Sequence, residues 1–202
     1  MLSYNNVCGF DGLYILEPKK FLDDRGYFQE LFNKDEFEIY TGINFQPVQE
    51  NESSSKSGVV RGLHFQKGDF EQAKLVKCLR GCIIDVALDI RKDSYSYGKF
   101  FSTVLSEKNN RQLFIPRGFA HGFIALSENR DNVIRYLTDN PYSPNDEDGI
   151  LFDEKYLNMA FNGAICDEFP KAIAEGFING KDSFPPLIFS EKDLKFKEWH
   201  NI

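Results

Sequence analysis

The chain has 202 residues, of which 42% are hydrophobic and 15% aromatic, so it can bury a core without disulfide staples. A disulfide-rich miniprotein and a disordered chain are both excluded. The 24 Lys and Arg against 31 Asp and Glu give a net charge of −7, the wrong sign for a general binder of nucleic acid or of an anionic membrane, so any anionic ligand must be bound by a few local basic side chains.

The sequence predicts one soluble domain over residues 1–202, because it shows neither an internal repeat nor a low-complexity linker between two halves. The longest apolar runs are far shorter than the roughly 20 residues that cross a bilayer, and residues 1–10 lack the basic start and apolar middle of a signal peptide. We therefore expect a cytoplasmic protein with no nucleic-acid or membrane partner.

The first predicted helix covers residues 33–40. Asn33 is a suitable N-cap, Asp35 and Glu36 place negative charge in the first turn, and Gly42 follows as a stop signal. After this helix, the Ser-rich stretch 53–58 is the only flexible-looking segment in the first half of the chain.

The middle of the chain predicts an all-β fold. Short segments rich in β-branched and aromatic residues are bounded by Gly, Asn and Pro, a spacing typical of a sandwich or barrel. The segments are residues 58–65, 74–79, 82–90, 100–105, 112–115, 121–126 and 132–138. A second helix is expected to begin at Pro170 and to end at Asn179-Gly180.

The segment 82–90 has two different faces. Alternation places Ile84, Val86 and Leu88 on one face, which we expect to pack in the core. The other face carries Asp85 and Asp89, so it is polar enough to line a cleft or to face water.

The cysteines are Cys8, Cys78, Cys82 and Cys166, and their uneven spacing in a chain without a secretion signal favours free thiols. Cys78 and Cys82 flank a predicted tight turn at Arg80-Gly81, where they could form a bridge or bind a metal. Since no second Cys or His pair lies near enough to complete a zinc site, we interpret them as small packing residues.

Only three histidines are present, and His200 lies two residues from the end of the chain. His64 and His121 lie in or beside predicted strands. Strict alternation places Arg61 across the strand from His64, unless Gly62 introduces a bulge that re-aims one of them. Each histidine taken alone is as readily a hydrogen-bonded structural residue as a functional one.

A catalytic metal is one alternative for these histidines, because His side chains on strands of small barrels bind Fe or Zn. The sequence has no His-x-His pair and lacks a third neutral ligand, so we expect no metal. Acid–base chemistry needs fewer groups: a base near neutrality, a cation for developing negative charge and an acid on the other face of the substrate. His64, Lys74, His121 and Tyr136 could supply these groups, with Arg61 as a further cation.

Taken together, these segments resemble the deoxythymidine-diphosphate (dTDP) 4-dehydrorhamnose 3,5-epimerase family of sugar-nucleotide enzymes. The resemblance covers most of residues 13–155 and a patch near residue 190. It is carried by LEP at 16–18, DRGYFQE at 24–30, VQEN at 48–51, VRGLHFQ at 60–66, KLV at 74–76, DVALDIR at 85–91, RQLFIP at 111–116, GFAHGF at 118–123, YSP at 142–144 and SEKD at 190–193.

The resemblance implies a cupin-type jelly-roll β-sandwich that uses no cofactor or metal and acts as a homodimer whose N-terminal strand reaches into the partner. It assigns His64 as the base that removes a proton beside the C4 ketone, with Asp193 as the carboxylate that orients it. Lys74 matches the cation near the C4 oxygen, and Tyr136 matches the acid that returns a proton from the opposite face.

The resemblance also implies a substrate-binding set. Arg61 and His121 match residues of the sugar pocket, with Asp85 as the partner of His121. The positions that match nucleotide and diphosphate contacts, some of them from the neighbouring subunit, are Arg25, Phe28, Glu30, Gln49, Asn51, Tyr142 and Lys192.

Two departures from the family pattern affect these assignments. Residues 157–186 make the segment before Asp193 longer than in the family and are expected to form a C-terminal extension. The turn over residues 127–132 is also long, so a register shift that points Arg135 inward in place of Tyr136 stays open.

The resemblance implies epimerisation at C3 and/or C5 of a nucleotide-linked 4-keto-6-deoxy-hexose, with dTDP-4-dehydro-6-deoxy-D-glucose as the expected substrate. The alternatives are a single-carbon epimerase on a GDP or CDP sugar and a non-catalytic sugar-binding jelly roll.

Overall fold

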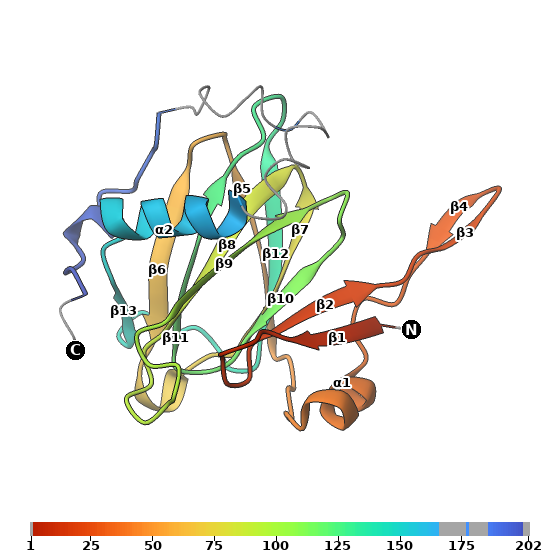
Figure 1. Cartoon of the computed structure of the whole chain (residues 1–202), viewed down its shortest axis with the longest axis horizontal. Helices are drawn as coiled ribbons and strands as arrows, with labels where there is room; N and C mark the ends of the chain where they lie inside the picture. The colour runs from red at the N-terminus through yellow and green to blue at the C-terminus, as the bar shows by residue number, and fades with distance from the viewer. Residues whose placement is uncertain (1, 166–176, 178–185, 200–202) are drawn as a thin grey trace.

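The computed structural model describes residues 2–165, 177 and 186–199, and two antiparallel sheets face each other in it (Figure 1). The larger sheet has the order β1 (Leu2–Asn6), β2 (Tyr14–Pro18), β10 (Gln112–Ile115), β7 (Lys74–Arg80), β12 (Asn132–Thr138) and β5 (Gln49–Ser55). The smaller sheet has the order β13 (Glu147–Gly149), β6 (Val60–Gln66), β11 (Phe119–Ala125), β8 (Cys82–Asp89) and β9 (Phe100–Ser106). The fold is the predicted all-β sandwich.

Each of the seven predicted strands is present, and two of them, β10 and β12, have the predicted bounds. The prediction for the Ser-rich stretch was wrong, because its first residues belong to β5. There Ser55 pairs with Asn132 and Ser53 with Ile134 of β12. The backbone ladder to a buried neighbour stabilises this strand although serine has a low strand propensity.

The first predicted helix is confirmed as α1 (Lys34–Thr41). The Asn33 side chain accepts a 3.1 Å hydrogen bond from the Glu36 N–H, and Gly42 ends the helix with a φ of 73°. The helix expected at 170–180 lies outside the described residues, apart from Phe177.

A helix that the sequence analysis missed, α2 (Glu154–Ile165), covers the outer face of the smaller sheet (Figure 1). Asp153 caps its first turn by accepting a hydrogen bond of 3.0 Å from the Tyr156 N–H. Tyr156 and Ala160 are buried against the sheet. Two short 3₁₀ turns, η1 (Gly68–Phe70) and η2 (Asp193–Lys195), complete the described elements.

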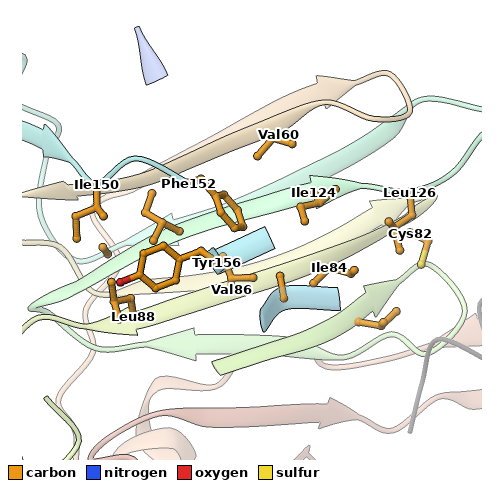
Figure 2. Close-up of a cluster of buried hydrophobic side chains, with 14 of the residues drawn as sticks. Val60, Cys82, Ile84, Val86, Leu88, Ile124, Leu126, Ile150, Phe152 and Tyr156 are labelled. Carbon is orange, nitrogen blue, oxygen red and sulfur yellow. The ribbon is translucent and has the colours of Figure 1, made fainter. Parts of the chain in front are cut away.

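Strand β8 separates two apolar clusters. On one side Ile84, Val86 and Leu88 pack with Phe152 and Tyr156 under α2 (Figure 2). The other side of β8 contributes to the core between the sheets, a cluster that includes Val76, Ile83, Ala87 and Ile134. The prediction that one face of this strand is core is confirmed, but the second face does not meet water, since Asp85 and Asp89 are fully buried.

The cysteine prediction is confirmed for the described residues. Cys8, Cys78 and Cys82 are free thiols, and the last two are buried in different clusters on either side of the β7–β8 turn. Among the described residues, no helix is long and apolar enough to cross a membrane.

A buried lysine lies on β7. Lys77 is almost fully buried and donates a hydrogen bond to the Asn110 side chain. Burial, together with the nearby positive charges of Lys20 and Arg135, lowers the pKa of Lys77 to about 8. The folded protein therefore carries this charge at a cost, which disappears when the amine loses its proton.

A two-stranded hairpin, β3 (Phe21–Asp23) with β4 (Gly26–Phe28), projects from the body of the sandwich (Figure 1). Its apolar side chains are exposed, with fractions of 47% for Phe21, 79% for Leu22, 59% for Tyr27 and 71% for Phe28. A concentration of exposed aromatic side chains on one hairpin is typical of an interaction surface.

Candidate active site

A cavity of about 160 Å³ with several ionisable side chains on its wall opens between the two sheets. Strands β5, β6, β7, β11 and β12 each contribute to it, so residues far apart in the sequence meet there. The lining residues are Ser53, Arg61, His64, Lys74, His121, Gly122, Phe123, Ile134 and Tyr136. The cavity wall thus combines apolar side chains with two histidines, two cations and a phenol. Such a concentration of reactive groups is typical of a catalytic site.

Two glycines explain how Arg61 and His64 both reach this cavity. Gly62 has a φ of 105°, and the pairing of β6 with β11 shifts register between His121 and Phe123. A Cβ on Gly62 would lie 2.6 Å from the His121 carbonyl oxygen and 2.7 Å from the Gly122 Cα. The irregularity that the sequence left open is therefore present, and only glycine fits at this close approach.

His64 is paired with Asp193, as the resemblance implied. The His64 Nε2 lies 2.7 Å from Asp193 Oδ1, and the exposed fractions of the two side chains are 29% and 5%. Burial acts to raise the pKa of Asp193, but the hydrogen bond and charge of His64, together with hydrogen bonds from Ser190 and the Gly62 backbone, hold the pKa below its ordinary value. Since a carboxylate only accepts hydrogen bonds, Nε2 carries the hydrogen, and Nδ1 of neutral His64 has the free lone pair of a base.

The position of Asp193 is fixed by the C-terminal chain on either side of it. Val59 bridges to Ile188, and Ile150 bridges to Lys197. Within that span the Asp193 N–H donates a 3.0 Å hydrogen bond to the Ser190 hydroxyl. The contact between His64 and Asp193 therefore joins residues 129 positions apart.

His121 and Asp85 form a second, deeper pair. The His121 Nε2 lies 2.9 Å from Asp85 Oδ1, and the side chains are 9% and 0% exposed. Burial lowers the pKa of His121, Asp85 opposes that effect, and the charges of Lys74 and His64 reinforce it. His121 is therefore neutral at pH 7 and donates its Nε2 hydrogen to Asp85.

Lys74 and Tyr136 lie beside each other on the opposite sheet. The Lys74 Nζ is 5.9 Å from the centroid of the Tyr136 ring. Burial lowers the pKa of Lys74 to about 8 and raises the pKa of Tyr136, so the phenol keeps its proton at neutral pH and can donate it. Arg135 pairs with Glu50 at 3.0 Å instead of lining the cavity, which resolves the register in favour of Tyr136.

A hydrogen-bonded group of polar side chains brings together four more of the predicted residues. The Gln49 amide donates to Asn51 at 2.8 Å and accepts from the Tyr142 N–H at 2.9 Å. Glu147 accepts from the Tyr142 hydroxyl at 2.6 Å and from Lys192 at 2.5 Å. The sequence analysis missed Glu147, for which the only signal was its place in an acidic run shortly after Tyr142.

Three predicted residues belong neither to the cavity lining nor to this hydrogen-bonded group, and they do not pair with a cavity residue. Arg25 and Phe28 lie on the projecting hairpin, where Arg25 pairs with Asp23 at 2.5 Å and Phe28 is 71% exposed. Glu30 follows the hairpin and accepts a 3.4 Å hydrogen bond from the Asn33 side chain. Ser53, by contrast, lines the cavity although the sequence analysis did not select it.

The cavity can perform proton transfer at a carbon. A base and an acid come from different sheets, His64 from β6 and Tyr136 from β12, and Lys74 supplies a cation from β7, next to β12. In residues 2–165, 177 and 186–199 no group of three or more His, Cys, Asp or Glu is arranged to hold a metal ion. The side chains present thus favour acid–base chemistry assisted by a lysine.

Comparisons with known proteins agree with this chemistry. Residues 8–201 match the family model described as dTDP-4-dehydrorhamnose 3,5-epimerase. The protein of that name from Salmonella typhimurium is 42% identical over 174 residues, which cover 86% of this chain and 89% of the relative. The solved structure from Elizabethkingia anophelis, with the same name, has 38% identity and a TM-score of 0.80 over 98% of this chain and 96% of that chain. The Legionella pneumophila dTDP-6-deoxy-D-glucose-3,5-epimerase, solved in complex with dTDP-4-keto-L-rhamnose, has 35% identity and a TM-score of 0.77 over 98% and 93% of the two chains.

Proposed function

This chain belongs to the dTDP-4-dehydrorhamnose 3,5-epimerase family, and from that membership we propose that it inverts C3 and C5 of dTDP-4-dehydro-6-deoxy-D-glucose to give dTDP-4-dehydro-L-rhamnose. The enzyme is an isomerase whose substrate is a dTDP-sugar. The observation that carries the proposal is the meeting of His64, Lys74 and Tyr136 in one cavity, because these groups are what inversion beside a ketone requires.

Inversion begins with the removal of a weakly acidic proton from the carbon beside the C4 ketone. In our proposal His64 takes this proton on Nδ1, and Asp193 stabilises the resulting imidazolium. The C4 oxygen becomes an enolate, and Lys74 supplies the positive charge that stabilises it in a pocket with little water.

The new proton must arrive from the other face of the ring. Tyr136 is proposed as its donor, since its hydroxyl keeps its proton at neutral pH and it extends from the sheet opposite His64. A base alone on one face would only exchange the proton without inversion. Exchange with water then removes the proton from His64 and returns one to Tyr136, and repeating the cycle at the second carbon gives the product with both centres inverted.

We propose that the remaining predicted residues bind the substrate. Arg61 and His121 line the cavity and would contact the sugar, and the group that includes Gln49, Asn51, Tyr142 and Lys192 would contact the nucleotide and diphosphate. In this proposal Arg25, Phe28 and Glu30 complete the site of a partner subunit in a homodimer. The projecting hairpin, with its exposed aromatic side chains, supports that arrangement.

We further propose that residues 1–202 act as one domain with an extension at 157–186, in the cytoplasm and without a cofactor. The single pair of facing sheets supports the first part of this proposal. The acid–base character of the cavity supports a reaction without a cofactor, since each proposed step uses only side chains of this chain.

Proton NMR in deuterium oxide tests the proposed function. Incubation of the protein with dTDP-4-dehydro-6-deoxy-D-glucose is expected to place deuterium at both C3 and C5 and to give the L-rhamno product. Deuterium and inversion at one carbon only would instead identify a single-carbon epimerase. Turnover of a GDP or CDP analogue in preference to the dTDP sugar would change the substrate class, and binding without exchange would identify a non-catalytic sugar-binding protein.

A further inference from the structure

A buried negative charge faces the catalytic lysine across the interior of the sandwich. Lys74 lies on β7 with the same inward alternation as Val76 and Cys78, which belong to the core between the sheets. Asp85 lies on β8 of the other sheet, where its neighbours in the alternation, Ile83 and Ala87, belong to that same core. The two charged side chains therefore approach one interior from opposite sheets.

The hydrogen bond to His121 involves one of the two carboxylate oxygens of Asp85. Its Oδ1 accepts from the imidazole, whereas its Oδ2 is buried with no hydrogen-bond partner among the described residues. His121 is neutral at pH 7, so it satisfies one oxygen without cancelling the negative charge. Within the described part of the chain, neither Asp85 nor Lys74 has an ion-pair partner of opposite fixed charge within 4 Å. A buried carboxylate in that state stabilises a nearby cation, and Lys74 is the cation that it influences.

We infer that Asp85 is a positioning residue that keeps Lys74 charged, so that the lysine can stabilise the enolate during the reaction. The inference rests on the proposed function for the role of Lys74. Asp85 acts through Lys74 and not on the substrate, and it uses Oδ2 for this effect while Oδ1 fixes the His121 ring.

The other ionisable groups around Lys74 cannot replace Asp85. Arg61 and His64 on β6 and His121 on β11 are cationic or neutral, and Tyr136 on β12 is neutral. Glu147 on β13 and Asp193 are further acids, but Glu147 is already paired with Lys192 and Tyr142, and Asp193 with His64. Burial is the main cause of the lowered pKa of Lys74, with Asp85 the stronger and Glu147 the weaker of the two opposing influences.

Removal of the Asp85 charge should therefore lower the pKa of Lys74 by roughly one further unit. With a pKa of about 8 in the parent and about 7 in Asp85→Asn, the protonated fraction of Lys74 at pH 8 falls from about one half to about one tenth. At pH 6 the fraction changes little. The loss of kcat/KM in the variant should thus be about fivefold greater at pH 8 than at pH 6.

The decisive measurement is the pKa of Lys74 itself, which needs no turnover. Protein labelled with [13C]lysine is titrated by NMR, and the Lys74 Cε signal is assigned by its absence in Lys74→Gln. Asp85→Asn should lower this pKa by about one unit, and the matched acid-to-amide control Glu147→Gln should lower it by less. If Asp85→Asn does not fold, the double variant Asp85→Asn with His121→Gln removes the same charge while pairing two amides.

A Lys74 pKa that stays at the parent value in the folded Asp85 variant would overturn the inference. A loss of kcat/KM equal at pH 6 and pH 8 would also overturn it, because that result is expected if Asp85 only orients His121. Failure of the proposed function would look different: the parent would then exchange no deuterium at C3 or C5, whereas the titration of Lys74 would still report the influence of Asp85.

Discussion

Replacing Tyr136 with phenylalanine removes one oxygen atom from the wall of the cavity and leaves the aromatic ring in place. The ring packs against the core between the sheets, and no hydrogen bond to its hydroxyl is present among the described residues. The substitution therefore breaks no internal hydrogen bond, and the free energy of unfolding should change by less than about 1 kcal/mol. Any loss of activity then reports chemistry and not folding.

The expected loss of activity follows from the proposed role of the Tyr136 hydroxyl as the general acid. A positioned general acid contributes about 10²- to 10⁴-fold, or about 3 to 5.5 kcal/mol of transition-state stabilisation. His64 and Lys74 remain, so the enolate still forms, and His64 returns a solvent-derived proton to the face from which it came. Tyr136→Phe should thus exchange deuterium at C3 or C5 while giving little inverted product.

The assay is proton NMR of the sugar in deuterium oxide, which follows exchange and inversion in one sample. His64→Ala is the matched control: without the base no enolate forms, so both exchange and inversion should be lost. If Tyr136→Phe inverts both carbons at the parent rate, Tyr136 is only a strand aromatic and another group, with ordered water the next candidate, must return the proton.

Four further expectations concern metal, substrate contacts, assembly and stability. Activity should survive exhaustive chelation, and a loss that returns on addition of Fe or Zn would contradict the proposal that Lys74 is the electrophile. Arg61→Ala should weaken binding of the sugar nucleotide more than binding of the free nucleoside diphosphate in calorimetry, because Arg61 lines the sugar cavity; equal losses would place it at the nucleotide end. Sedimentation should show a dimer that Phe28→Ala weakens, and a fully active monomer at assay concentration would exclude the shared site. Lys77→Met should raise the free energy of unfolding at pH 7 by about 1 to 2 kcal/mol after allowance for solvent screening, and the gain should shrink toward pH 10. Folding lowers the pKa of Lys77 from 10.5 to about 8, so between pH 8 and 10.5 the unfolded chain binds more protons than the folded chain. The stability of the parent therefore rises with pH in this range, and the advantage of Lys77→Met shrinks. An advantage of the variant that stays constant with pH would refute this reasoning.

Local patterns predicted the central strands well because their side chains alternate in the ordinary way. Strands β10 and β12 have the predicted bounds, and α1 begins at the predicted Asn33 cap. Other elements depend on contacts that are distant in sequence. Strand β5 is stabilised by its ladder to β12, and α2 by burial of Tyr156 and Ala160 against a sheet that only the folded chain contains.

The site was predictable in its residues but not in its geometry. The resemblance selected His64, Lys74 and Tyr136, and the structure places all three on one cavity. Whether Arg61 shares that cavity depended on the register shift beside Gly62, which alternation cannot give. Glu147 was missed because its role depends on meeting Lys192, which lies 45 positions later in the chain.

The bridges at residues 188 and 197 have a consequence for how this sequence can change. Both anchors lie beyond the segment 157–186, and between them they hold the turn that carries Asp193 against His64. The carboxylate that orients His64 is therefore held by contacts on both sides of its own turn. The described part of the preceding segment ends at Ile165 and has a different role, because α2 buries Ala160 against the smaller sheet. A substitution in α2 should thus lower the stability of the fold, whereas loss of either bridge should disturb the base directly.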